Sequence, residues 1–138
     1  MYKNVLVPVD LAHKEQAGAM IQNALAFMTP DAKLTLFFVM PEIPPVLELQ
    51  MPEGSAEKAK ADVQEQLHAL AKSNSTPQTT SIMTSVGRPH HKILELADSQ
   101  NIDLIVMASH KPGLADYLLG SVAASVVRHA KCSVHVIR

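Results

Sequence analysis

The chain lacks the residues from which disulfide and zinc frameworks are built. Cys132 is the only cysteine among 138 residues, which excludes an intrachain disulfide and a zinc site of the CxxC type. We expect Cys132 to fill core space, because an unpaired cysteine usually behaves as a small buried hydrophobe. The seven histidines include no HExxH or His-x3-His pair, and the adjacent His90 and His91 would point to different faces of a helix. We therefore expect no metal site.

The chain also has no excess of basic residues and no long apolar run near its start. The formal net charge is -1, and no dense Lys/Arg stripe is present to follow a phosphate backbone, which argues against a nucleic-acid partner. The stretch before Asp10 holds one lysine and about five apolar residues, fewer than the ~7 to 15 of a signal-peptide core or the ~20 of a spanning helix. We expect a cytoplasmic protein that does not engage a membrane.

Three motifs of well-known enzyme classes do not occur. The absence of GxxxxGK[ST] excludes a P-loop nucleotide hydrolase, and the absence of GxGxxG after the first apolar stretch argues against a dinucleotide cofactor. GxSxG is also missing, so the usual nucleophile elbow of α/β hydrolases is excluded.

What is present is a chain that alternates apolar strands with amphipathic helices. With 47% hydrophobic residues, it is long enough to form one domain, residues 1–138, with a sizeable core. Continuous apolar or β-prone runs predict strands at 4–9, 34–40, 79–86, 102–107 and 133–137. The first helix has its apolar face at Ala17, Met20, Ile21, Ala24, Leu25 and Met28, and Thr29-Pro30-Asp31 should end it.

Proline and capping residues set the remaining boundaries. Four prolines between Pro41 and Pro52 exclude regular helix and central strand there and predict a long surface excursion. Further helices should begin at Ser55, after Gly87-Arg88-Pro89, and near Gly120.

The alternation predicts an α/β fold, namely a doubly wound, five-stranded parallel sheet with helices on both faces. The first and fourth strands are the most hydrophobic, so the strand order should be 3-2-1-4-5, with those two strands central. Ligands of such sheets bind beyond the carboxyl ends of the strands, where the order reverses. Asp10 and the segment 108–121 should meet there.

Residues 107–128 carry the strongest local signal for a ligand. Ser121 occupies the expected N-cap position of a helix, so the N–H groups of Val122, Ala123 and Ala124 would point toward an anion, with Lys111 adding positive charge. A capped helix after an ordinary surface loop would explain the same pattern, and this stretch alone does not separate the two hypotheses.

Several motifs along the chain, including this stretch, carry a family resemblance. The opening VLVPVD, the turn GRP and the segment DLIVMASHKPG...YLLGSVAASVVRHAKCSVHVIR together resemble the universal stress protein family across essentially the whole chain. Nucleotide-binding members have the loop G-x2-G-x9-G-[ST]. Here Ala108 replaces the first glycine, Lys111 lies at or near the second, and eight residues separate Lys111 from Gly120. Gly120 and Ser121 are retained, and the variant resembles a subgroup of small bacterial members in which nucleotide binding survives a similar loss.

The resemblance implies a role for each matching residue. Asp10 would accept hydrogen bonds from ribose hydroxyls or the adenine edge, although it could instead cap the first helix. Gly87 would let the chain pass close to the ribose, although a plain turn glycine is nearly as good an explanation. The other implied contacts are Pro8, Val9, Val39 and Met40 around the base, Met107 and Ala108 beside the ribose and α-phosphate, His110 and Lys111 along the phosphates, and Gly120, Ser121 and the Val122 N–H at the terminal phosphate.

Three hypotheses for function follow. The resemblance implies a non-catalytic stress-response regulator that binds ATP, ADP or AMP, with or without magnesium. The first alternative is a slow ATP hydrolase or phosphotransferase, for which Asp116 or His110 would be the candidate base. The second alternative is a nucleotide-free dimeric scaffold. The apolar edge strand with Val134, Val136 and Ile137 predicts a homodimer through antiparallel pairing, as the resemblance also implies.

Overall fold

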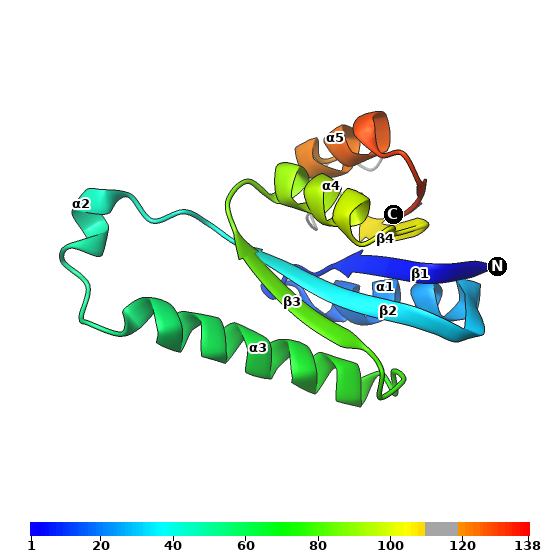
Figure 1. Cartoon of the computed structure of the whole chain (residues 1–138), viewed down its shortest axis with the longest axis horizontal. Helices are drawn as coiled ribbons and strands as arrows, with labels where there is room; N and C mark the ends of the chain where they lie inside the picture. The colour runs from blue at the N-terminus through cyan, green and yellow to red at the C-terminus, as the bar shows by residue number, and fades with distance from the viewer. Residues whose placement is uncertain (110–118) are drawn as a thin grey trace.

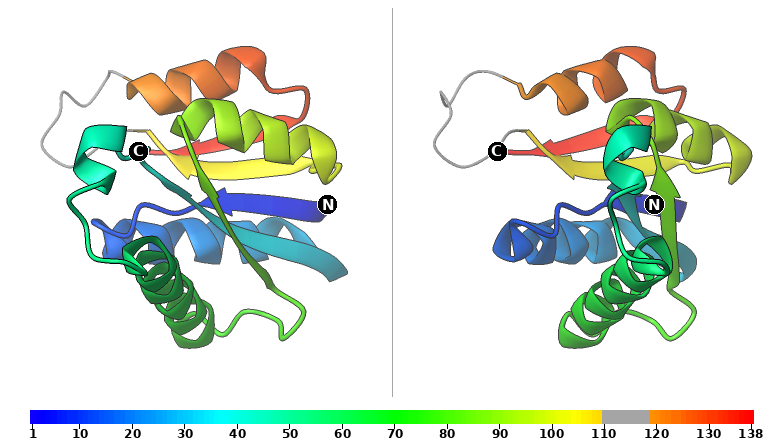
Figure 2. Two further views of the ribbon diagram at one scale, coloured as in Figure 1. Left: turned by 60° about the vertical axis from the view of Figure 1, so that its left-hand side comes forward. Right: turned by 90° about the vertical axis from the view of Figure 1, so that its left-hand side faces the viewer.

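The computed structural model describes residues 1–109 and 119–138. Its elements are β1 (Tyr2–Pro8), α1 (Lys14–Phe27), β2 (Met28–Met40), α2 (Pro45–Glu48), α3 (Ser55–Ser73), β3 (Ser81–Val86), α4 (Pro89–Ser99), β4 (Leu104–Ala108), α5 (Ser121–His129) and β5 (Ser133–Ile137). The strands form one parallel sheet in the order β3-β2-β1-β4-β5. Helices α4 and α5 cover one face and α1 and α3 the other (Figures 1 and 2). The doubly wound fold and its strand order are confirmed.

The centre of the sheet is apolar on both faces, as expected for parallel strands covered by helices. Val5, Leu6 and Val7 of β1 are successive residues with 0% exposure. Residues Leu104 to Met107 of β4 are likewise buried on both faces. Edge strand β3 is only partly buried, in line with its more polar sequence. The core therefore lies around β1 and β4, whose carboxyl ends point to the same edge of the sheet.

The junction between α1 and β2 differs from the sequence prediction. Helix α1 ends at Phe27, and Met28 already begins β2, so Thr29-Pro30-Asp31 lies within the strand bounds and not between two elements. The pairing shifts from Tyr2 opposite Met28 to Asn4 opposite Lys33. A break in the ladder at this point accommodates Pro30, which has no N–H to donate. The other predicted strands begin and end within about two residues of the observed ones.

The proline-rich segment contains a short helix, so the prediction that it holds none was wrong. Helix α2 has Pro45 at its first position, where a missing N–H costs nothing. The N–H groups of Leu47 and Glu48 donate to Pro44 O at 2.9 and 3.0 Å. All residues from Pro41 to Gly54, which we call the arm, are exposed. The arm extends away from the sheet (Figure 1), as expected for a surface excursion.

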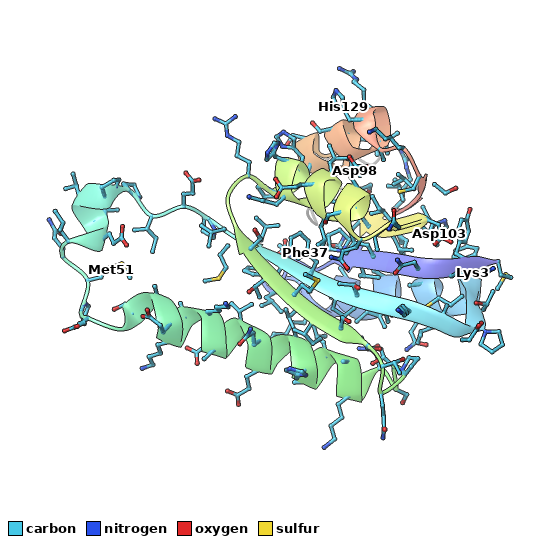
Figure 3. The ribbon with its side chains drawn as sticks, in the orientation of Figure 1. Lys3, Phe37, Met51, Asp98, Asp103 and His129 are labelled. Carbon is cyan, nitrogen blue, oxygen red and sulfur yellow. The ribbon has the colours of Figure 1, made fainter. Side chains whose placement is uncertain are left out.

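Asp103 fastens the start of β1 to the start of β4. Its Oδ2 accepts the Lys3 N–H and its Oδ1 the Asn4 N–H, each at 2.9 Å, while its own N–H donates to Asn4 O at 2.9 Å. Figure 3 shows Lys3 and Asp103 next to each other at the amino-terminal edge of the sheet. Two residues about 100 positions apart in the chain are thus held together by a carboxylate that satisfies two backbone donors.

We expect Asp103→Ala to lower the free energy of unfolding by about 2 to 3 kcal/mol, because two charge-assisted hydrogen bonds are lost in a partly exposed position. Asp103→Asn should cost less, since its amide oxygen can still accept one bond. Urea unfolding followed by circular dichroism measures both changes. The control is Asp98→Ala, which removes only an exposed ion pair to Lys131 and should cost less than about 1 kcal/mol. Equal losses in the two alanine variants would contradict the role given to Asp103.

Candidate functional site

A cavity of about 700 Å³ opens at the carboxyl ends of β1, β2 and β4. It lies where the sheet order reverses, which is the place predicted for a ligand. Its walls come from the ends of these strands, from α1 and α4, and from the N-terminus of α5. The lining residues are Pro8, Val9, Asp10, Gln16, Met20, Phe37, Phe38, Val39, Pro41, Pro89, Ile93, Met107, Ala108, Ser109, Gly120, Ser121, Val122 and Ala123.

The cavity has an apolar wall and a few polar groups at defined places. Val9, Phe37 and Val39 at the strand ends, with Met20 of α1, provide apolar surface. The polar side chains of the lining belong to Asp10, Gln16, Ser109 and Ser121. An apolar pocket with a few convergent polar groups is typical of small-molecule sites.

Asp10 follows β1 and organises the turn into α1. Its Oδ1 accepts the Ala12 N–H at 3.0 Å, and its backbone oxygen accepts the His13 N–H at 3.0 Å. Its Oδ2 lies 2.9 Å from Nδ1 of His13. The N-cap of α1 is His13, whose side chain makes no capping bond. Asp10 is therefore not the cap of α1, the alternative role considered from the sequence; it shapes the turn before the helix and lines the cavity.

The N-terminus of α5 differs in detail from the sequence prediction. The N-cap is Gly120, with φ -63° and ψ 157°, and Ser121 is the first helical residue. Glycine is acceptable at an N-cap, so serine was not needed there. The Ala124 N–H donates to Gly120 O at 2.9 Å. The N–H groups without a partner inside the helix are thus those of Ser121, Val122 and Ala123, one residue earlier than predicted.

Ser109 ties the ends of three elements together. Its N–H donates to Ile137 O at 2.8 Å, and its backbone oxygen accepts the Gly120 N–H. The residue after β4 and the residue before α5 are therefore joined by a backbone hydrogen bond. This bond fixes the N-terminus of α5 next to the carboxyl end of β4, at the mouth of the cavity.

The structure brings most of the predicted site residues to this cavity. Those that line it are Pro8, Val9, Asp10, Val39, Met107, Ala108, Gly120, Ser121 and Val122. Met40 and Gly87 are not part of the lining; the Gly87 N–H donates to Met40 O at 2.9 Å, which joins the ends of β2 and β3. His110 and Lys111, like the candidate base Asp116, lie outside the described residues.

Gly87 has a structural reason to be glycine. Its φ is +147°, and a Cβ at this position would lie 2.9 Å from Cε of Lys92. A side chain there would be strained and would displace the lysine that packs over the turn. This geometry favours the turn-glycine explanation over close approach to a ribose.

Several lining residues were not predicted from the sequence. They are Gln16, Met20, Phe37, Phe38, Pro41, Pro89, Ile93 and Ser109. Met20 and Ile93 lie on the apolar faces of their helices, and the same pattern describes an ordinary core position. Ser109 had a usable signal, because a polar residue directly after a buried central strand lies at the ligand-binding edge of the sheet.

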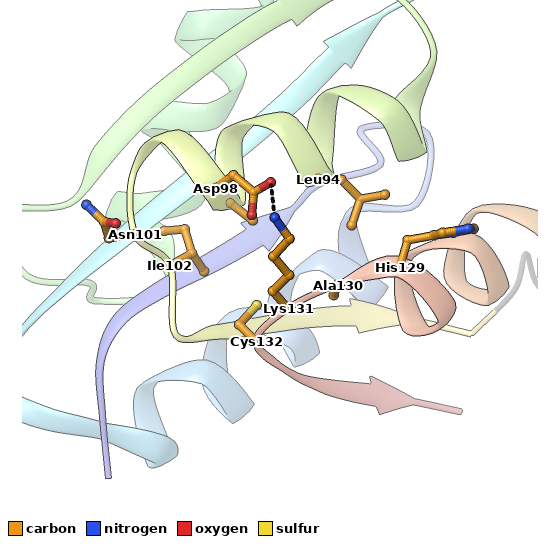
Figure 4. A pocket seen from close by; sticks show the side chains of 9 residues that line it. Leu94, Asp98, Asn101, Ile102, His129, Ala130, Lys131 and Cys132 are labelled. Carbon is orange, nitrogen blue, oxygen red and sulfur yellow. Dashed lines mark ion pairs between the residues drawn. The ribbon is translucent and has the colours of Figure 1, made fainter.

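A second, smaller cavity of about 170 Å³ lies between the C-terminal ends of α4 and α5 (Figure 4). Lys131 Nζ is 3.7 Å from Asp98 Oδ2 at its rim, and Cys132 lines it. Burial raises the pKa of the Cys132 thiol, and the nearby charges of Asp103 and Asp98 add to the effect. The thiol therefore stays protonated at neutral pH, which favours a packing role over a nucleophilic one.

Residues 1–109 and 119–138 contain neither a metal-binding cluster nor a membrane-spanning helix. No three His, Cys, Asp or Glu residues in these ranges lie close enough to hold a metal ion. In the same ranges, no helix has both the length and the apolar character needed to cross a membrane.

Comparison with known proteins gives a consistent result. The model of the universal stress protein family matches residues 1–138. Universal stress protein G of Escherichia coli O157:H7 is 29% identical over 146 residues, with each chain covered completely. The structure of hypothetical protein MJ0577 superposes with a TM-score of 0.82 at 28% identity, covering 99% of this chain and 96% of that one.

A further structural relative is a universal stress protein solved in complex with cAMP. Its TM-score is 0.60 at 24% identity, over 99% of this chain and 97% of the other, a likeness that concerns the fold. The match of the family model over the full length, together with the sheet order, establishes the family. The chain belongs to the universal stress protein family.

Proposed function

We propose that this protein is a stress-response regulator that binds ATP or ADP in the cavity beside β1 and β4 without using it as a substrate. The observation that carries the proposal is the position of Asp10 and the α5 N-terminus on one apolar cavity. A nucleotide has three parts that match: a flat base for the apolar wall, ribose hydroxyls for the carboxylate, and phosphates for the helix N-terminus.

The phosphate end is the N-terminus of α5. The backbone N–H groups of Ser121, Val122 and Ala123 have no partner within the helix, and all three residues line the cavity. These donors and the positive end of the helix dipole favour an anion. The hydrogen bond between Gly120 and Ser109 keeps this end of the helix in place. Little reorganisation would then be needed when phosphate binds.

The base end is formed by β1, β2 and α1. Val9, Phe37, Val39 and Met20 would pack against the faces and edges of adenine. A cavity of about 700 Å³ falls within the range of about 300 to 1,000 Å³ seen for small-molecule sites. The cavity is therefore large enough for a nucleoside with phosphate attached.

Binding is favoured over hydrolysis by the groups available. Hydrolysis needs a base that orients water at the terminal phosphate. Among the described residues that line the cavity, Asp10 is the one acidic or basic side chain, and its oxygens contact Ala12 and His13 at the other end of the site. A slow ATP hydrolase remains the second candidate, with a base among the residues that the structure does not describe.

Calorimetric titration with ATP, ADP and AMP, with and without magnesium, tests the proposal directly. We expect saturable one-site binding, and no phosphate release above background in a parallel assay. Phosphate release that depends on this cavity would favour the hydrolase. If no adenine nucleotide binds, and mass spectrometry finds none in the purified and denatured protein, the nucleotide-free scaffold becomes the better hypothesis.

Ser121→Ala should weaken ATP binding about tenfold or more, because one hydrogen bond to a charged phosphate is worth about 1.5 to 3 kcal/mol. The same titration measures the change. Ser125→Ala is the matched control, since Ser125 lies on the same helix and is not part of the cavity lining. Equal affinity in wild type and both variants would place the phosphate elsewhere.

We also propose a homodimer through β5. This strand pairs with β4 on one side and lies at the edge of the sheet, where Val134, Val136 and Ile137 are partly buried. An uncharged apolar edge tends to recruit a second strand, and a two-fold axis would pair two copies antiparallel. A polar solvent-facing edge would be expected if the protein were monomeric.

Truncation after Ala130 should give a monomer or insoluble protein, because it removes β5 and the Ile137 oxygen that accepts the Ser109 N–H. Light scattering coupled to size-exclusion chromatography measures the mass. The wild-type chain should run at twice its 15.0 kDa. A soluble dimer formed by the truncated chain would overturn the assignment of β5 as the interface.

A further inference from the structure

We propose that His13 is a positioning residue that holds the Asp10 carboxylate toward the cavity and so sets the preference for ribose over deoxyribose. This inference rests on the proposed nucleotide-binding function and deepens it. The observation behind it is the 2.9 Å contact between His13 Nδ1 and Asp10 Oδ2. His13 does not line the cavity itself, so any effect on a ligand must pass through Asp10.

The two oxygens of Asp10 are held by different partners. Oδ1 accepts the backbone N–H of Ala12 at 3.0 Å, and Oδ2 accepts the ring N–H of His13. The terminal torsion of an aspartate is broad, so a single bond to Oδ1 would leave Oδ2 free to move about it. The second bond fixes the plane of the carboxylate. His13 thus supplies the constraint that the turn alone does not provide.

The hydrogen-bond pattern also fixes which ring nitrogen carries the proton. An ionised carboxylate only accepts, so Nδ1 of His13 must be the donor in this contact. Nδ1 donates both in the neutral tautomer that carries its proton there and in the protonated ring.

His13 shows no other described task that would explain its orientation. It is the N-cap residue of α1, yet its side chain makes no capping bond to the helix. Its ring turns back to Asp10, and 29% of its side chain is exposed, against 44% for Asp10. The ring of His13 is thus the less exposed member of the pair.

The acceptor sites left free on the Asp10 carboxylate match the hydroxyls of ribose. An ionised carboxylate offers about four acceptor sites, and two of them are occupied by Ala12 and His13. One site on each oxygen remains for a ligand. Two neighbouring hydroxyls, such as the 2′ and 3′ groups of ribose, can each donate to one of these sites if the plane of the carboxylate is fixed. Loss of that plane would remove at least one of the two bonds.

The test compares ATP with 2′-deoxy-ATP in calorimetric titrations of four proteins: wild type, His13→Ala, His13→Asn and His91→Ala. We expect the wild type to prefer ATP about tenfold, the value of one hydrogen bond to a charged group. His13→Ala should lose most of this preference while its affinity for 2′-deoxy-ATP changes little. His13→Asn should restore it, because the asparagine amide nitrogen is a donor at the same distance from Cβ as Nδ1.

The control and the other outcomes separate this inference from the proposed function. His91 lies on α4, where its ring is 3.6 Å from exposed Glu95, and His91→Ala should keep the wild-type preference. No binding of either nucleotide to the wild type would overturn the proposed function. If the wild type binds without preference, or if His13→Ala keeps the preference or weakens both ligands equally, the positioning role is wrong while nucleotide binding stands.

Discussion

Replacing Leu6 with alanine should destabilise the protein by about 3 to 4 kcal/mol, as is usual for a large aliphatic residue removed from a tight core. Leu6 is 0% exposed and lies in the middle of β1, opposite Thr35 of β2 and Ile105 of β4. The substitution leaves a cavity between the two helical layers, because strands on both sides hold the backbone in place. Urea unfolding followed by circular dichroism measures the loss.

The matched control for Leu6→Ala is Leu47→Ala. Leu47 belongs to α2 on the arm and is 52% exposed, so its truncation should change stability by no more than about 0.5 kcal/mol. Similar losses at the two positions would mean that the arm packs against the core in solution.

Gly120→Val should reduce ATP affinity about a hundredfold or more, the largest effect that we expect at the site. A valine side chain at the N-cap of α5 would occupy the space next to the N–H groups of Ser121 and Val122, and two charge-assisted bonds would be lost. The effect comes from bulk alone. The φ of Gly120 is -63°, which is open to any residue, so backbone strain adds nothing to the effect. Gly120→Ala should therefore fall between wild type and valine.

Gly18→Ala provides the control for the glycine series. Gly18 lies within α1, and a Cβ there would make ordinary contact, 3.5 Å from Asn74 Oδ1. This substitution should leave ATP affinity unchanged and slightly stabilise the helix. If Gly120→Val binds ATP as well as Gly18→Ala does, the phosphates do not lie at the α5 N-terminus.

The order of the strands could be predicted because it depends on a property of whole segments. Residues 5–9 and 104–107 are apolar at every position, which fits strands covered on both faces. Their central position fixed the reversal point, and with it the edge where Asp10 and Ser121 meet. Strand hydrophobicity was therefore enough to bring together two residues more than a hundred positions apart.

Local boundaries were less predictable, because more than one residue can satisfy the same backbone requirement. Gly120 and Ser121 are both acceptable N-caps, and their order is decided by the bond from the Gly120 N–H to Ser109, a contact that depends on the tertiary structure. Similarly, Pro30 predicts the end of a helix before a separate strand, yet it lies within β2, where the pairing with β1 is irregular. The contact of His13 with Asp10 could not be predicted, because no sequence motif marks the turn that brings these two side chains together.

The pairing of β1 with β4 has a consequence for folding during synthesis. Val5 lies opposite Leu104, so β1 cannot complete its pairing until the ribosome has made about a hundred further residues. Until then one edge of β1 is open, and the part of the cavity wall that comes from β4 and α5 is missing. A chain stalled before β4 would contain Asp10 and no α5 N-terminus to face it. The proposed nucleotide would therefore bind only after α5 has been made, and the apolar edge of β1 is an aggregation risk in the unfinished chain.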